Sequence, residues 1–131
     1  MKKLFWIVLA LMLLTACGQT KEEIDATQGA VYVNITAQEA KEVMDTQEGY
    51  VILDVREQDE YDESHIPGAI LIPYEQIPEK AESILTDKDQ LILVYCRSGR
   101  RSKIAAESLV ELGYTNIKEF GGIIDWPYEV E

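Results

Sequence analysis

The sequence is poor in the side chains that hold metals and build disulfide frameworks: its 131 residues include two cysteines and one histidine. They show no metal-ligand spacing, and no glycine pattern typical of nucleotide binding is present. We therefore expect no cofactor and no metal. Internal repeats and low-complexity tracts are also missing. The length suits one domain with a real core and is too short for two.

Basic residues are also scarce. The chain has twelve lysines and arginines against 24 aspartates and glutamates, which gives a formal net charge of −12. Such a surface argues against nucleic acid as a partner and against adsorption to anionic lipid. The exception is a cluster of Arg97, Arg100, Arg101 and Lys103 within seven positions. This cluster follows Cys96 directly, so positive charge is concentrated beside a thiol.

The first segment has the layout of an export signal. Two lysines precede an unbroken apolar run at 4–14, which is shorter than a membrane-spanning helix. The run closes with Leu-Thr-Ala-Cys at 14–17, which resembles the lipobox of bacterial lipoproteins. We expect residues 1–16 to be a lipoprotein signal peptide and Cys17 to be acylated, with palmitate for example. The alternative is an ordinary secretory signal in which Cys17 is incidental.

Residues 17–29 look like a lipidated cysteine with a flexible polar tether, and residues 30–131 form the expected domain. A tether of this length spans on the order of 20 Å. Several acyl chains anchor a protein stably, so we expect the chain on the extracytoplasmic face of a bacterial membrane. Removal of two lysines with the signal leaves a net charge of −14. Acylation of Cys17 leaves Cys96 without a disulfide partner.

The rest of the chain alternates strands with helices. Thr36 and Glu39 form a capping box that opens a helix reaching about Thr46. Pro78 makes the start of a later helix irregular or marks its first position. The predicted strands are 31–35, 50–55, 69–72, 91–95 and 117–120, and the predicted helices or turns are 36–46, 57–63, 74–85 and 102–112. This pattern predicts an α/β fold, a small parallel-stranded sheet with helices on both faces.

Cys96 lies at the turn between a predicted strand and a predicted helix, where parallel sheets bind ligands. Backbone N–H groups of such a turn cradle anions, and the helix dipole and nearby arginines stabilise a thiolate. Cations at a helix start oppose the dipole, so the arginines fit best if an anion binds there. Two plainer explanations are a buried core cysteine and a solvated basic helix start.

Two stretches in this order and spacing are similar to the single-domain rhodaneses. The first has Leu-Asp-Val-Arg-Glu at 53–57, Glu-Tyr at 60–61 and His-Ile-Pro-Gly-Ala at 65–69. The second has Tyr-Cys-Arg-Ser-Gly-Arg-Arg-Ser at 95–102, followed by Ala105, Leu109, Gly113 and Gly-Gly at 121–122. The resemblance covers about residues 31–126 and implies a rhodanese-like fold.

The resemblance also implies a sulfurtransferase that works through a persulfide on Cys96. Its partners would be a small anionic sulfur donor such as thiosulfate and a thiol or cyanide acceptor. The expected substrate-binding residues are those of the loop: Arg97, Ser98, Gly99, Arg100, Arg101 and Ser102. By charge and position, Arg97 and Arg100 are our candidates for the donor's sulfonate group, whereas Arg101 is expected to brace the loop.

The residues of the first motif suggest structural support of the site. We expect Asp54, Arg56 and Glu60 to hold the strand end against the loop, with an Arg56–Glu60 salt bridge if the intervening residues are helical. His65 is the only histidine and hence a candidate general base. Its setting before Ile-Pro-Gly favours a hydrogen bond that fixes a turn.

Two other functions remain open. Phosphatases and arsenate reductases of related folds place an arginine six positions after the cysteine, where this chain has Ser102. Arg101 comes one residue early, and the shorter cradle suits sulfur better than a phosphoryl group. The other alternative is a non-catalytic or sulfur-carrier docking module, against which the presence of Cys96 argues.

Overall fold

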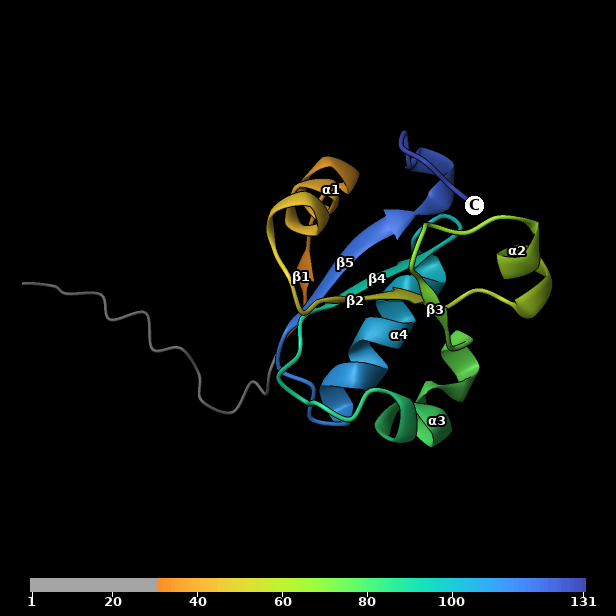
Figure 1. Cartoon of the computed structure of the whole chain (residues 1–131). Helices are drawn as coiled ribbons and strands as arrows, with labels where there is room; N and C mark the ends of the chain where they lie inside the picture. Colours follow the sequence, from red (N-terminus) through yellow and green to blue (C-terminus); the bar gives the residue numbers. More distant parts are fainter. Residues whose placement is uncertain (1–30) are drawn as a thin grey trace, which may run out of the picture.

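The computed structural model describes residues 31–131, which form a five-stranded, wholly parallel sheet in the order β1-β5-β4-β2-β3 (Figure 1). The strands are β1 (Val33–Asn34), β2 (Val51–Asp54), β3 (Ile70–Leu71), β4 (Ile92–Cys96) and β5 (Ile117–Gly122). The expected signal peptide, the acylated Cys17 and the tether lie outside the described residues.

Helices cover both faces of the sheet, as Figure 1 shows. The helices are α1 (Ala37–Thr46), α2 (Gln58–Glu63), α3 (Ile77–Ile84) and α4 (Arg100–Glu111), with short 3₁₀ turns η1 (Tyr74–Gln76) and η2 (Ile123–Asp125). One core cluster lies between the sheet and α3 with α4, and another lies on the α1 face around Tyr95, Phe120 and Trp126. The predicted fold class is confirmed.

Local signals explain how the helices begin. The hydroxyl of Thr36 accepts the N–H of Glu39 at 3.1 Å, and the Glu39 carboxylate accepts the N–H of Thr36 at 2.8 Å. This is the predicted capping box, which satisfies two N–H groups that the first turn leaves free. The irregular start that Pro78 indicated is the turn η1, which ends where α3 begins.

The start of α4 differs from the prediction. The helix begins at Arg100, two residues before Ser102, because Gly99 adopts a left-handed conformation with φ of 107° and turns the chain at once. Arg100 and Arg101 are therefore the first two helical residues. Strand β5 also runs to Gly122, past the predicted end at Phe120, and its last residue pairs with Cys96.

The sheet places Cys96 at the carboxyl end of its central strand, β4. Every residue of β4 is buried, and Cys96 is its last residue, next to Gly122 of β5. The register shifts between Val94 and Cys96, so the strand is irregular just before the thiol. The carboxyl ends of parallel strands gather at one edge, and this edge carries the Cys96 loop.

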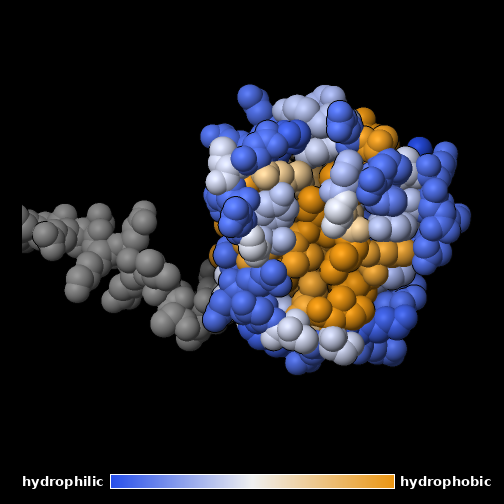
Figure 2. All heavy atoms as spheres, viewed as in Figure 1, coloured by the Kyte–Doolittle hydropathy of each residue, from blue (hydrophilic) through white to orange (hydrophobic). Residues whose placement is uncertain are grey.

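The surface carries one clear apolar area in the view of Figure 2, over β3 and toward α3, ringed by hydrophilic residues. Ile70 of β3 and Ile84 of α3 are exposed large apolar side chains. Within residues 31–131, every helix is too short or too polar to cross a bilayer.

Candidate active site

The sulfur of Cys96 contacts both the turn that follows it and the helix beyond. It accepts the backbone N–H of Gly99 at 3.0 Å, and its S–H donates to Ser102 Oγ at 3.3 Å. The N–H groups of the first turn of α4 have no acceptor within their own helix, so they are free for an anion. The loop therefore offers N–H donors at a helix start beside a nucleophilic atom.

Cys96 is more deeply buried than a polar turn predicts, because the residue is 1% exposed and belongs to the core cluster on the α4 side. Its backbone lies in the central strand, whereas its sulfur makes polar contacts only an irregular loop provides. The plain core-cysteine explanation accounts for the burial but not for these contacts. The thiol is thus shielded and held by hydrogen bonds at the same time.

Two glycines of β5 support the loop, and the sequence motif did not reveal why. A Cβ on Gly122 would lie 1.9 Å from the carbonyl oxygen of Arg97 and 2.5 Å from the nitrogen of Ser98. Only a residue without a side chain lets the Arg97–Ser98 peptide approach this closely. Gly121 packs against Gly99, and Ile124 donates its N–H to the Arg97 carbonyl at 3.2 Å. The end of β5 therefore packs directly against the backbone of the loop.

The arginines of the loop divide into two kinds. Arg97 and Arg100 are exposed, as a contact with an anion from solution requires. Arg101 instead donates to both carboxylate oxygens of Glu60, at 2.6 and 2.8 Å. The hydrogen bond from Arg101 lowers the pKa of Glu60 to about 2, and the same bond raises the pKa of Arg101. Arg101 thus ties the start of α4 to α2.

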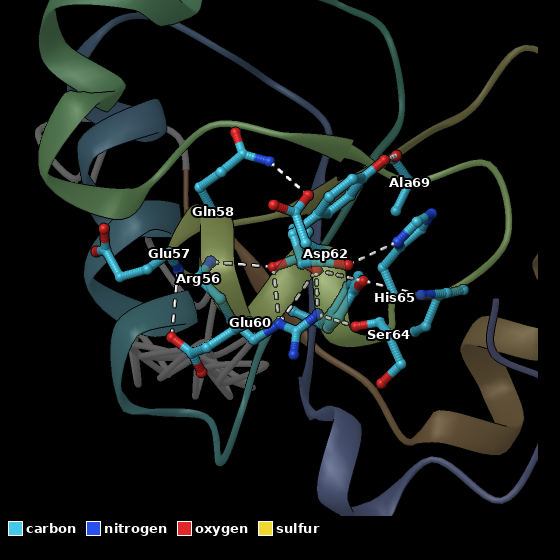
Figure 3. Close-up of polar contacts among 12 residues, drawn as sticks. Arg56, Glu57, Gln58, Glu60, Asp62, Ser64, His65 and Ala69 are labelled. Carbon is cyan, nitrogen blue, oxygen red and sulfur yellow. Dashed lines mark hydrogen bonds and ion pairs between the residues drawn. The ribbon is translucent and has the colours of Figure 1, made fainter.

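The expected Arg56–Glu60 salt bridge is wrong. Arg56 pairs with Asp54, with its Nη2 2.7 Å from Oδ2 and its Nε 3.0 Å from Oδ1. The backbone between them turns so that the guanidinium folds back onto the strand end, which leaves Glu60 for Arg101. Figure 3 shows the Arg56 guanidinium reaching toward Ser64, to whose carbonyl oxygen it donates at 2.7 Å.

A buried network joins this pair to β4, the strand that ends at Cys96. The hydroxyl of Tyr95, the residue before Cys96, donates to Asp54 Oδ2 at 2.6 Å and accepts the N–H of Ile66 at 3.1 Å. Burial and the bond to Asp54 raise the pKa of Tyr95 strongly, so its hydroxyl stays protonated. The network connects the end of β2, the end of β4 and the loop at 64–66, which places Asp54 and Arg56 behind the site.

His65 fixes a turn. Its Nδ1 lies 2.9 Å from the carbonyl oxygen of Tyr61, and its ring stacks on that of Tyr61 at 3.8 Å. Its backbone exchanges two hydrogen bonds of 2.9 Å with Glu131 near the chain end. These contacts agree with the structural role and give the ring no link to the Cys96 loop.

Sequence reasoning missed Glu119. This carboxylate on β5 is 2% exposed, and its Oε1 accepts the hydroxyl of Ser102 at 2.6 Å and the N–H of Gly121 at 2.8 Å. Ser102 is fully buried and lies between Glu119 and the sulfur of Cys96. The available signal was an acidic residue within the predicted strand 117–120. That signal does not indicate that Glu119 contacts Ser102, 17 positions earlier.

A large groove on the described surface lies away from the thiol. A groove of about 760 Å³ lies on the α1 face, lined by Met44, Tyr50, Ile66, Trp126 and Tyr128 among others. None of its lining residues belongs to the Cys96 loop. The chemistry therefore identifies the site better than the shape does. Among residues 31–131, no three potential metal-ligating side chains gather in one place.

Comparison with known proteins agrees with this geometry. The sequence profile of the rhodanese-like domain matches residues 36–127. The thiosulfate sulfurtransferase PspE of Escherichia coli is 40% identical over 73 residues, which cover 56% of this chain and 70% of PspE. The thiosulfate sulfurtransferase GlpE of Coxiella burnetii is 36% identical over 97 residues, 73% of this chain and 88% of GlpE.

The solved structures agree as well. One described as a rhodanese with anions from E. coli aligns with a TM-score of 0.59 at 35% identity, over 63% of this chain and 96% of that one. The profile match includes both the support network of Asp54 and the loop of Cys96. The chain therefore belongs to the rhodanese family, whose relatives include single-domain thiosulfate sulfurtransferases.

Proposed function

We propose that the protein transfers a sulfane sulfur from thiosulfate, or a similar anionic donor, to a thiophilic acceptor through a persulfide on Cys96. The observation that carries the proposal is the contact of the Cys96 sulfur with the Gly99 N–H at the start of α4. Relatives named as thiosulfate sulfurtransferases support the choice of donor.

In the first half-reaction, the Cys96 thiolate attacks the outer sulfur of thiosulfate. A bond forms between the two sulfur atoms, the bond from the outer sulfur to the sulfonate sulfur breaks, and sulfite leaves with that electron pair. The persulfide keeps one negative charge. The N–H of Gly99 and the dipole of α4 are placed to stabilise that charge, as in an oxyanion hole.

In the second half-reaction, cyanide or a thiolate attacks the outer persulfide sulfur. The new bond forms on the acceptor, the sulfur–sulfur bond to Cys96 breaks, and Cys96 leaves as a thiolate. The enzyme therefore alternates between two forms, which predicts ping-pong kinetics. Arg97 and Arg100 are the exposed arginines of the loop, so in this proposal they attract the donor anion.

Intact-mass measurement tests this proposal. The 131-residue chain carrying Cys17→Ser, so that Cys96 is its one thiol, is incubated with thiosulfate and then with cyanide. We expect a gain of one sulfur atom that cyanide removes as thiocyanate, and no gain in the Cys96→Ser control. No gain by a chain whose thiol is confirmed as reduced would contradict the proposal and favour a carrier or oxyanion-binding role.

We also propose that the chain is a lipoprotein acylated at Cys17 and held on the extracytoplasmic face of a bacterial membrane. The support is the signal-like layout of residues 1–17. Bacteria expressing the chain are grown with labelled palmitate. We expect label and membrane association in the wild type and neither in Cys17→Ala; label in both, or in neither, would contradict acylation at this residue.

A further inference from the structure

A buried carboxylate lies directly behind the thiol, separated from it by one hydroxyl group. Glu119 is 2% exposed, Ser102 is fully buried and Cys96 is 1% exposed. The S–H of Cys96 donates to Ser102 Oγ at 3.3 Å, and the Ser102 hydroxyl donates to Glu119 Oε1 at 2.6 Å. The proposed sulfur transfer makes no use of Glu119.

The Ser102 hydroxyl has a single proton to donate. The carbonyl oxygens of Gly99 and Gly121 lie 3.0 and 3.3 Å from Ser102 Oγ, farther than Glu119 Oε1. A charged acceptor at the shortest distance takes the proton. Ser102 therefore turns a lone pair, not a proton, toward the sulfur. The hydrogen bond between the sulfur and Ser102 exists only while Cys96 carries its own proton.

Charged and titratable groups face the cluster from each element packed around it. On α4, the pKa of Arg101 is raised mainly by its hydrogen bond to Glu60 and to a smaller extent by the charge of Cys96. Tyr32, just before β1, has its pKa raised first by burial and then by the charges of Glu107 and Glu119. In front of the sulfur, the Gly99 N–H favours a thiolate; behind it, the carboxylate opposes one, because like charges disfavour each other's ionisation.

We propose that Glu119 is a positioning residue that, acting through Ser102, holds resting Cys96 as a thiol and thereby sets the pH range in which Cys96 is nucleophilic. The inference rests on Cys96 being the nucleophile of the proposed function. In this arrangement the Gly99 N–H stabilises a negative charge on the sulfur, and the Glu119 carboxylate destabilises it. A buried resting thiol is also less open to oxidation than a thiolate.

Glu119→Gln separates charge from shape. The glutamine carbonyl oxygen still accepts from Ser102 and Gly121, but the negative charge is gone. Half-ionisation of Cys96 is expected at a lower pH, by about one unit, which is about tenfold more thiolate at a given pH below the midpoint. The matched control is Glu107→Gln, which removes the same charge from an exposed position on α4.

The readout is the ultraviolet absorbance of the thiolate, titrated with pH in the Cys17→Ser chain with the Cys96→Ser chain subtracted. The rate of alkylation by iodoacetamide over the same pH range gives a second curve. A lower midpoint in Glu119→Gln and not in Glu107→Gln supports the proposal. A midpoint that is unchanged or higher in Glu119→Gln overturns it.

If Glu119→Gln fails to fold, Ser102→Ala is titrated in the same way. It removes the hydroxyl that accepts the S–H, so the midpoint is again expected to fall, and an unchanged midpoint overturns the proposal. Neither titration uses thiosulfate. A shifted midpoint in a chain that gains no sulfur would leave this inference standing and reject the sulfur transfer; an unshifted midpoint in a chain that does gain sulfur would do the reverse.

Discussion

Arg101 and Glu60 form a two-point ion pair that joins helices 41 positions apart in the sequence, with N–O distances of 2.6 and 2.8 Å. Their side chains are 18% and 24% exposed, so solvent screens the pair only in part. Arg101 is the second residue of α4 and belongs to the loop that follows Cys96. The pair therefore links the end of the loop directly to α2.

The pair makes stability depend on pH in the acid range. The pKa of Glu60 is about 2 in the folded protein and 4.5 in its ordinary state, so its contribution is complete above about 4.5. As the pH falls from there toward 2, the contribution is lost. We expect Glu60→Gln to have a lower free energy of unfolding than the wild type at about pH 6, and the two free energies to converge at about pH 2. Urea unfolding at each pH measures the difference.

Glu63→Gln is the control, because Glu63 is exposed on the same helix. A gap between wild type and Glu60→Gln that stays constant as the pH falls would show that the ion pair is not its source.

Gly122→Ala is expected to abolish the geometry of the loop while leaving the sheet folded. The added Cβ meets the Arg97 carbonyl at 1.9 Å, so the Arg97–Ser98 peptide must move. Misplacement of reacting groups by about 1 Å costs roughly 100-fold in rate, and we expect a loss of that order in persulfide formation with thiosulfate. Gly49→Ala, at a strained but open position, should leave the rate unchanged. Wild-type rates in Gly122→Ala would refute the supporting role of β5.

Asp54→Asn is expected to destabilise the fold, because it leaves the buried Arg56 guanidinium without its partner. Removing one member of a buried ion pair costs about 3–5 kcal/mol. Chemical denaturation measures the loss. The exposed Asp62→Asn on α2 should change stability by less than about 0.5 kcal/mol. Equal effects of the two substitutions would mean that the network at the end of β2 contributes little.

Arg97 and Arg100 should control affinity for the donor more than the chemical step. Charge-assisted hydrogen bonds contribute about 1.5–3 kcal/mol, so Arg97→Gln with Arg100→Gln is expected to raise the KM for thiosulfate about tenfold or more. The kcat should change less. Lys80→Gln on α3 removes an exposed charge elsewhere and serves as control. If the KM rises no more in the double variant than in the control, the two arginines are excluded as the anion site.

Features encoded by neighbouring residues were predictable from the sequence, and contacts across the sheet were not. The capping box of Thr36 and Glu39 needs one turn of chain, so its pattern is visible. The wrong partner for Glu60 arose because spacing of four suggested Arg56, whereas the fold brings Arg101 to it. Likewise, Glu119 meets Ser102 only once β5 lies beside α4.

The loop itself was partly predictable. Its residues mark a strand-to-helix turn, but the sequence did not show that Gly99 would take a left-handed conformation, and so α4 began earlier than expected. The burial of Cys96 also escaped prediction. It depends on the close approach of Gly121 and Gly122, which is a property of the neighbouring strand and not of the loop.

The parallel direction of all five strands determines which way the reactive end of the domain faces. Val33 of β1 is aligned, through Lys118 of β5, with Leu93 of β4, so the chain enters the sheet three residues before the level of Cys96, at roughly 10 Å measured along the strands. Whatever precedes residue 31 joins the domain at the pole opposite the thiol. The Cys96 loop and the point where the preceding chain joins therefore lie at opposite ends of the strands, so the joining chain leaves the approach to the loop open.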